Sequence, residues 1–191
     1  MRSPLLAFLI IFATGYSVPD LAQASGPATV IATDFDKKKE LDAIFKSLAK
    51  APNAGASQPI VDRLWLTWMM TPDAQSADDL NKAIRARRGY SYNTALDILD
   101  TLIARHPTYP ESWNQRSYVH FLKEDYEKSL ADCEHALTLE PRHIGCLTGM
   151  ARILIRHQKR FEAGKKLLKK AMTLHPFIYE QVLLKEIPQS E

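Results

Sequence analysis

The chain has few of the residues from which catalytic, metal-binding and disulfide sites are usually built. Its 191 residues include two cysteines, seven glycines and six histidines. Two cysteines are too few for a disulfide framework, and seven glycines leave no Gly-rich loop that could cradle a phosphate. No histidine stands in a zinc-binding spacing such as His-Glu-x-x-His, and no Gly-x-Ser-x-Gly elbow occurs. We therefore predict a protein that is not an enzyme and that binds no cofactor or metal.

An excess of one sign of charge is also lacking. Lysine and arginine number 25 against 22 aspartates and glutamates, which gives a net charge of +3. A balance this even gives no reason to expect nucleic acid as a partner. Hydrophobic residues make up 46% of the chain, so disorder throughout is excluded and one ordinary domain can have a core.

The N-terminus predicts export. Arg2 precedes a short apolar run, Leu5–Ala13, and a small-x-small site follows at Ala22-Gln23-Ala24. These are the three parts of a secretory signal peptide, and the run is too short for the ~20 residues of a membrane-spanning helix. We predict a signal peptide over 1–24, cleaved before Ser25, a flexible linker over 25–35 and a periplasmic protein with no membrane span in the mature chain. An uncleaved anchor is the alternative.

From residue 36 onward the apolar residues recur at helical spacing. Residues 36–71 read as two amphipathic helices separated by Pro52–Gly55, and we expect this hairpin to cap one end of the remaining fold. Beyond it, four sets of residues recur at intervals of 34 or 35. The sets are Ala83, Ser117 and Ala151; Tyr92, Tyr126 and Phe161; Ala95, Ser129 and Gly164; and Pro107, Pro141 and Pro176.

A period near 34 with two helices per unit resembles the tetratricopeptide repeat (TPR) family. The copies span 76–109, 110–143 and 144–176, and the last has one extra residue between its helices, around 157–160. Further family positions are matched by Trp113, Ala136 and Ala171. The resemblance, to an exported bacterial TPR protein, implies an all-α, right-handed solenoid of about three helical hairpins. The N-terminal hairpin would cap it at one end, and a helix over 177–187 at the other.

The resemblance also implies a function. First helices of such repeats line a concave groove that receives a peptide or partner segment. Carried onto this chain, the groove comprises Arg87, Asn114, Tyr118, Phe121, Arg152, Ile155 and Arg156, together with Glu111, Leu122, Thr148, Leu80 and Ile84. The family's carboxylate clamp would need lysine and asparagine at 80 and 84, so its chaperone-binding activity is not expected. Arginines beside aromatic residues suit a segment that carries carboxylates.

The resulting hypothesis is an exported adaptor that binds another protein. The main rival is a structural subunit of an envelope assembly that contacts its partners through its caps or its lysine-rich outer face. A third hypothesis is binding of acidic polymers through the lysine-rich face of Lys159–Lys170.

Two local predictions follow from the repeat register. Arg116 and Asp132 lie level on paired helices, where a variant of the family places arginine and aspartate, so we expect a charge-assisted hydrogen bond. Cys133 and Cys146 should remain free thiols, because their helix positions imply an axial offset of order 10 Å.

Overall fold

The computed structural model describes residues 34–188, and the predicted signal peptide and nearly all of the predicted linker lie outside this part. Regular structure within it is helical. The elements are α1 (Asp34–Leu48), α2 (Ala54–Trp68), α3 (Ala74–Arg88), α4 (Tyr92–Arg105), α5 (Pro110–Leu122), α6 (Tyr126–Leu139), α7 (Ile144–Arg152), the π-helix η1 (Ile153–His157), α8 (Phe161–Leu174) and the 3₁₀-helix η2 (Tyr179–Glu186).

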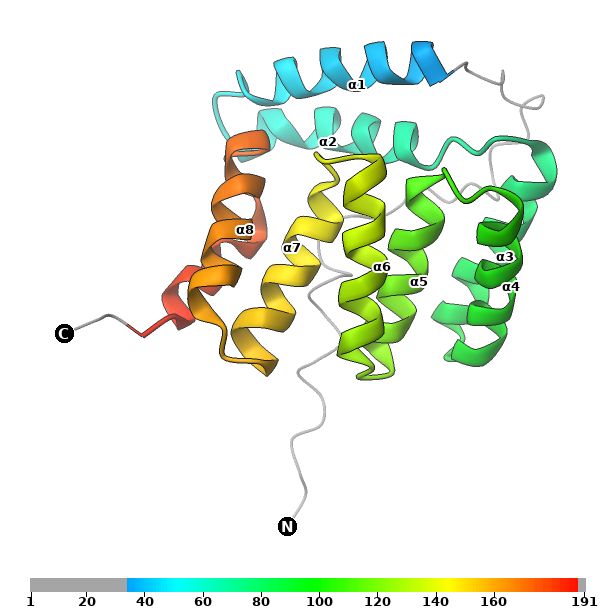
Figure 1. Cartoon of the computed structure of the whole chain (residues 1–191). Helices are drawn as coiled ribbons and strands as arrows, with labels where there is room; N and C mark the ends of the chain where they lie inside the picture. The colour runs from blue at the N-terminus through cyan, green and yellow to red at the C-terminus, as the bar shows by residue number, and fades with distance from the viewer. Residues whose placement is uncertain (1–33, 189–191) are drawn as a thin grey trace.

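Three hairpins, α3–α4, α5–α6 and α7–α8, stand side by side (Figure 1). Small residues allow this close packing, since Ala83, Ala95, Ser117, Ser129 and Ala151 are all buried. The expected all-helical hairpin solenoid is confirmed.

The turns between paired helices share one conformation. Tyr90, Glu124 and Lys159 have φ values of 61°, 61° and 56°, and each lies two residues before the second helix of its repeat. Left-handed backbone at a repeating position shows that all three hairpins reverse in the same way.

The extra residue of the third repeat is absorbed in a different place from the one expected. The prediction put it in the turn at 157–160, whereas the structure has a π-helical turn, Ile153–His157, at the end of the first helix. A π turn widens the helix by one residue without breaking it. Residues after the turn are therefore rotated by about 100° relative to the regular repeat register.

The N-terminal hairpin does not stack on one end of the array, which corrects the sequence expectation. Figure 1 shows α1 and α2 lying across the ends of the repeat helices. Their apolar side chains, among them Leu64 and Trp68, share a core cluster with Leu147 and Ala171 of the third repeat. In addition, the Tyr109 hydroxyl donates to the carbonyl of Trp68 at 3.1 Å. The hairpin thus ties the turns between repeats together.

The C-terminal end closes the third repeat. The element over Tyr179–Glu186 is a 3₁₀-helix that packs on α8 and α7, with Leu183 1% exposed. No helix of residues 34–188 is both long and apolar enough to cross a bilayer.

Cys133 and Cys146 are free thiols, as predicted, but the reason given for it is wrong. Both are buried in one cluster, and burial together with a hydrogen bond between the two thiols raises the pKa of Cys146 well above its usual value. The interaction between the two thiols places them closer together than the predicted axial offset implied.

Candidate binding groove

The first helices of the repeats form one continuous face, because α3 contacts α5 and α5 contacts α7. Residues one repeat apart on this face form the series Leu80, Asn114 and Thr148; Ile84, Tyr118 and Arg152; and Arg87, Phe121 and Ile155. Leu80, Ile84 and Thr148 are buried in the fold, and Glu111 and Arg152 are buried as well. The groove positions with partial exposure are Arg87, Asn114, Tyr118, Phe121, Leu122 and Arg156.

Arg87 and Tyr118 form the polar centre of this face in the first two repeats. The Arg87 guanidinium lies 4.4 Å from the centroid of the Tyr118 ring, and its Nη1 donates to Gln115 Oε1 at 3.0 Å. Burial lowers the pKa of Arg87 and raises that of Tyr118. No carboxylate of residues 34–188 forms an ion pair with Arg87. The guanidinium is thus partly desolvated, and the buried Glu111 carboxylate acts on it electrostatically without forming an ion pair.

An aromatic row continues from Tyr118 toward the third repeat. The Tyr118 and Phe121 rings lie 6.5 Å apart, and Phe121 lies 5.9 Å from Tyr126. His157 then stacks on Tyr126 at 4.1 Å, and its burial lowers its pKa. The His157 ring thus extends the aromatic row of Tyr118, Phe121 and Tyr126, which we call the aromatic strip.

The third repeat presents a different surface, because the C-terminal element covers it. Arg152 Nη2 donates to Glu180 Oε1 at 3.4 Å, and Arg156 forms two hydrogen bonds with the Glu186 carboxylate. The bonds to Glu186 raise the pKa of Arg156, whereas burial lowers that of Arg152. Both groove arginines predicted in the third repeat, Arg152 and Arg156, are therefore paired with glutamates of the same chain.

Ile155 is not a groove residue, which corrects the sequence prediction. It is 1% exposed, and a Cβ placed on Gly164 would come 2.5 Å from its Cγ1. The π turn is the reason, because it rotates Ile155 toward α8 and brings Arg156 to the face that Phe121 occupies in the second repeat.

A buried network supports the face from below. Glu111 accepts hydrogen bonds from Asn114 Nδ2 at 3.1 Å and Gln115 Nε2 at 2.6 Å. His143 Nδ1 accepts from the backbone N–H of Cys146, so Nε2 carries the proton and donates to Glu111 at 3.0 Å. Burial alone would raise the pKa of Glu111, but these hydrogen bonds lower it. Trp68 stacks on His143 at 4.3 Å and so connects the hairpin to this network.

The sequence did not reveal this network, nor the glutamates over the third repeat. Glu111 and His143 lie 32 residues apart, and Trp68 comes from a separate hairpin. Asn114 is correctly placed on α5, yet its amide is already bonded to Glu111 and to the Cys146 thiol. The Asn114 side chain therefore holds α5 and α7 in position, and its amide is not free to bind a partner.

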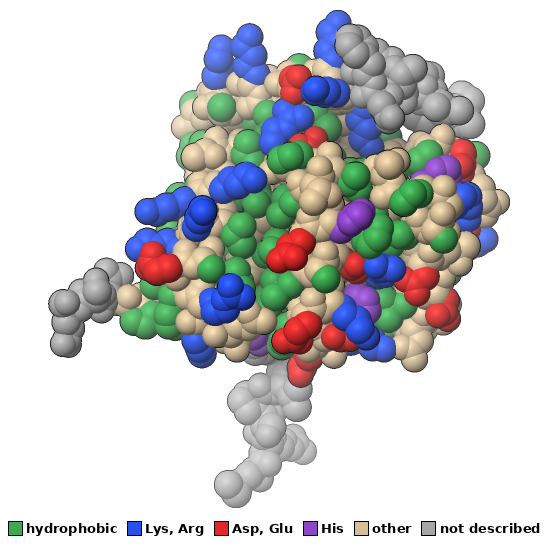
Figure 2. Space-filling view, in the orientation of Figure 1, with side chains coloured by type: hydrophobic (Ala, Val, Ile, Leu, Met, Phe, Trp, Pro, Cys, Tyr) green, Lys and Arg blue, Asp and Glu red, His purple; other side chains and the backbone are tan. Residues whose placement is uncertain are grey.

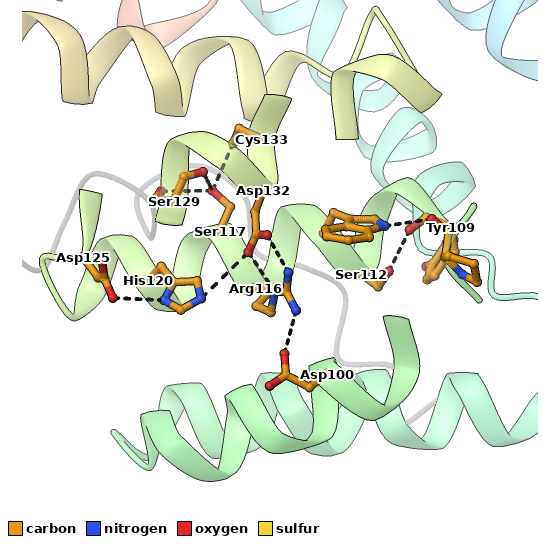
Figure 3. Close-up of polar contacts among 12 residues, drawn as sticks. Asp100, Tyr109, Ser112, Arg116, Ser117, His120, Asp125, Ser129, Asp132 and Cys133 are labelled. Atoms are coloured by element: carbon orange, nitrogen blue, oxygen red, sulfur yellow. Dashed lines mark hydrogen bonds and ion pairs between the residues drawn. The ribbon is translucent and has the colours of Figure 1, made fainter. Parts of the chain in front are cut away.

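The opposite side of α5 carries the predicted ion pair. Arg116 donates to both carboxylate oxygens of Asp132, at 2.9 and 2.7 Å, and also to Asp100 at 2.7 Å (Figure 3). The bonds to Asp132 raise the pKa of Arg116. This prediction is confirmed.

The adjoining groups are shown in the same view. His120 lies 3.8 Å from Asp125 and 3.9 Å from Asp132, beyond hydrogen-bond reach, and burial lowers its pKa (Figure 3). Ser117 hydrogen-bonds with Ser129 and Cys133. These contacts join α5 to α6 and hold the face in register.

The described residues show which chemical groups the first-helix face offers. No group of three or more His, Cys, Asp or Glu side chains in residues 34–188 is arranged to hold a metal ion. The first-helix face offers a guanidinium, a phenol and an aromatic strip, which can bind and orient a segment of chain. Together with the stacked hairpins, this defines the class: a helical-repeat protein with a candidate groove on its first helices.

Comparisons with known proteins show which repeats the hairpins resemble. A TPR repeat-containing protein from Rhizobium etli is 40% identical over 123 residues, which cover 61% of this chain and 57% of the relative's length. The first TPR of Spaghetti (RPAP3), solved with the HSP90 peptide SRMEEVD, superposes with a TM-score of 0.57 at 20% identity, over 60% of this chain and 92% of that one. No protein-family model matches the chain. The three hairpins resemble tetratricopeptide repeats in fold, and part of the chain is similar in sequence to a TPR repeat-containing protein.

Proposed function

We propose that this protein is an exported, periplasmic adaptor whose first-helix face binds an extended segment of another protein through an acidic residue placed on Arg87. The observation that carries the proposal is the state of the three arginines on this face. Arg152 and Arg156 meet glutamates of the C-terminal element, whereas Arg87 contacts Gln115 and Tyr118. Arginine binds carboxylates with paired, charge-assisted hydrogen bonds, so a carboxylate of the partner would form the ion pair that Arg87 lacks within residues 34–188.

The aromatic strip gives the remaining binding surface. Tyr118 and Phe121 are partly exposed beside Arg87, and tyrosine and arginine are frequent hot spots of protein interfaces. The peptide bound by the structurally similar TPR of Spaghetti is itself acidic. That likeness supports a peptide as the occupant without naming this protein's partner.

The test is selection from a random peptide library on the immobilised protein, followed by calorimetry. We expect selected peptides to be rich in Asp or Glu, and Arg87→Gln to weaken their binding by about tenfold or more. Arg85→Gln on the same helix, where the side chain is exposed, is the control and should leave affinity unchanged. Equal effects of the two variants would contradict the role of Arg87.

Export is tested separately. Mass spectrometry of the protein from its native host should find an N-terminus at Ser25. A mature protein that retains Met1 would contradict export by cleavage while leaving the groove proposal intact.

A further inference from the structure

A cluster of exposed basic side chains lies on the outside of α8 and in the turn before it. Lys159 and Arg160 end the turn before this helix, and Lys166, Lys169 and Lys170 follow on it; all five side chains are exposed. We call these five residues the lysine face. Figure 2 shows Lys and Arg side chains gathered on the left, where α8 lies in Figure 1.

The near-neutral total charge conceals this segregation. Residues 159–170 hold six lysines and arginines and one glutamate, so the rest of the chain holds 19 basic residues against 21 acidic ones. Glu162 lies 3.7 Å from Lys165, which is outside the lysine face. Within residues 34–188, the salt bridges of the fold involve none of Lys159, Lys166, Lys169 or Lys170. The face is therefore an unneutralised patch on a protein that is otherwise slightly acidic.

The exposed side chains of α8 are charged or polar, and none is apolar. Gly164, Leu168 and Ala171 of α8 point into the core, and Glu162 and Thr173 are the other exposed side chains of the helix. Protein interfaces are depleted in lysine and depend on aromatic, apolar and arginine anchors in their buried centres. A protein partner that docks by shape complementarity has nothing to fill here. Such a surface is suited to a partner with a high density of negative charge.

We propose that the lysine face binds the anionic phospholipid headgroups of a membrane. Lysine is a compact charge suited to phosphate groups, and basic residues near an anionic leaflet each add to binding without a specific pocket. The apolar Leu5–Ala13 run favours a membrane over other polyanions, because either as a signal or as an anchor it brings the chain to a bilayer. This inference is independent of the groove.

The experiment is sedimentation of the full-length chain with sucrose-loaded vesicles. One set is made from equal parts of phosphatidylglycerol and phosphatidylcholine, the other from phosphatidylcholine alone. Any binding by the N-terminal apolar run occurs with both sets, so the measured quantity is the ratio of the two partition coefficients. We expect the anionic vesicles to be preferred, with a preference that falls steeply as salt is raised.

A matched pair of variants locates the effect. Lys166→Glu/Lys169→Glu/Lys170→Glu should reduce the preference by at least about tenfold. Lys38→Glu/Lys39→Glu/Lys46→Glu changes net charge equally at exposed positions of α1, where acidic neighbours are frequent, and should retain most of it. Circular dichroism checks that both variants fold.

Three outcomes would overturn the proposal. They are no preference of the wild type for anionic vesicles, equal losses in both triple variants, and binding to duplex DNA under conditions where the vesicles are not bound.

Discussion

The second and third repeats share a fold, but different kinds of side chains form the same contact between their paired helices. Arg116 and Asp132 form an ion pair between the helices of the second repeat. One repeat later the corresponding residues are Met150 and Leu167, which pack together in an apolar cluster. The repeat pattern therefore requires a contact between the two helices at this position. Either an ion pair or apolar packing can form that contact.

The two repeats also differ in what their first helices expose. Tyr118 and Phe121 are partly exposed in the second repeat, whereas a single extra residue in the third turns Ile155 into the core. The C-terminal element then covers Arg152 and Arg156. A one-residue insertion and a short added element thus restrict the candidate groove mainly to the first two repeats.

Removing the contact between the N-terminal hairpin and His143, at the start of the third repeat, should have the largest effect on the free energy of unfolding. Trp68 is 2% exposed and stacks on His143 at 4.3 Å, so Trp68→Ala leaves a large cavity. We expect a loss of about 3–5 kcal/mol in the free energy of unfolding. Chemical denaturation measures it, and hydrogen exchange should show α7 opening more readily than α5. Trp113→Ala, at a partly exposed tryptophan, is the control; an equal loss there would remove the bridging role of Trp68.

Converting the second repeat to the chemistry of the third tests the central comparison. Arg116→Met leaves the Asp132 carboxylate, whose side chain is 7% exposed, without its partner and should cost about 1–3 kcal/mol. Arg116→Met/Asp132→Leu supplies the third-repeat pair and should recover most of that loss, because apolar pairs often replace buried ion pairs without penalty. Urea midpoints decide between these outcomes. A double variant less stable than Arg116→Met would contradict the equivalence of the two contacts.

The close approach at Gly164 belongs to the third repeat alone. Gly164→Ala would place a Cβ 2.5 Å from Ile155 Cγ1, so we expect a destabilisation of about 1–3 kcal/mol. Adding Ile155→Ala to Gly164→Ala should relieve the clash, and the two changes should be non-additive in a double-mutant cycle. Simple additivity would show that the π turn does not press Ile155 against α8.

The second and third repeats should also differ in how their stability depends on pH. The second repeat ends at Glu140, the third at His175, where burial lowers the histidine pKa to about 4. An unfolded histidine has a pKa near ~6.5, so the unfolded chain takes up a proton first, and stability falls as pH drops from about 6.5 to 4. We expect His175 to contribute about 1–3 kcal/mol to this fall in stability. Thermal melts should show a shallower pH dependence for His175→Gln; an unchanged dependence would contradict it.

The sequence predicted the features that depend on spacing within a repeat. Periodic small residues and prolines located the three hairpins, and the level positions of Arg116 and Asp132 predicted their ion pair. Local register alone determines each of these. The extra residue of the third repeat was also detected, but spacing between Ala151 and Phe161 counts residues without saying where they are accommodated.

What the sequence did not predict depends on contacts between distant segments. The position of the hairpin follows from Trp68 meeting His143, and the neutralised arginines follow from Glu180 and Glu186. Neither contact belongs to the repeat pattern, so periodicity carries no information about them. For this reason the sequence prediction placed Ile155 on the first-helix face, whereas the structure buries it.

The groove proposal is tested most directly by comparing one groove variant with one outer-face variant. A library-selected acidic peptide is titrated by calorimetry into the wild type, Tyr118→Ala and Lys166→Glu. Tyr118 supports the Arg87 guanidinium at 4.4 Å, so Tyr118→Ala should weaken binding by about tenfold or more, whereas Lys166→Glu should change affinity little. A larger loss from Lys166→Glu would place the peptide on α8 and contradict binding at the first-helix face.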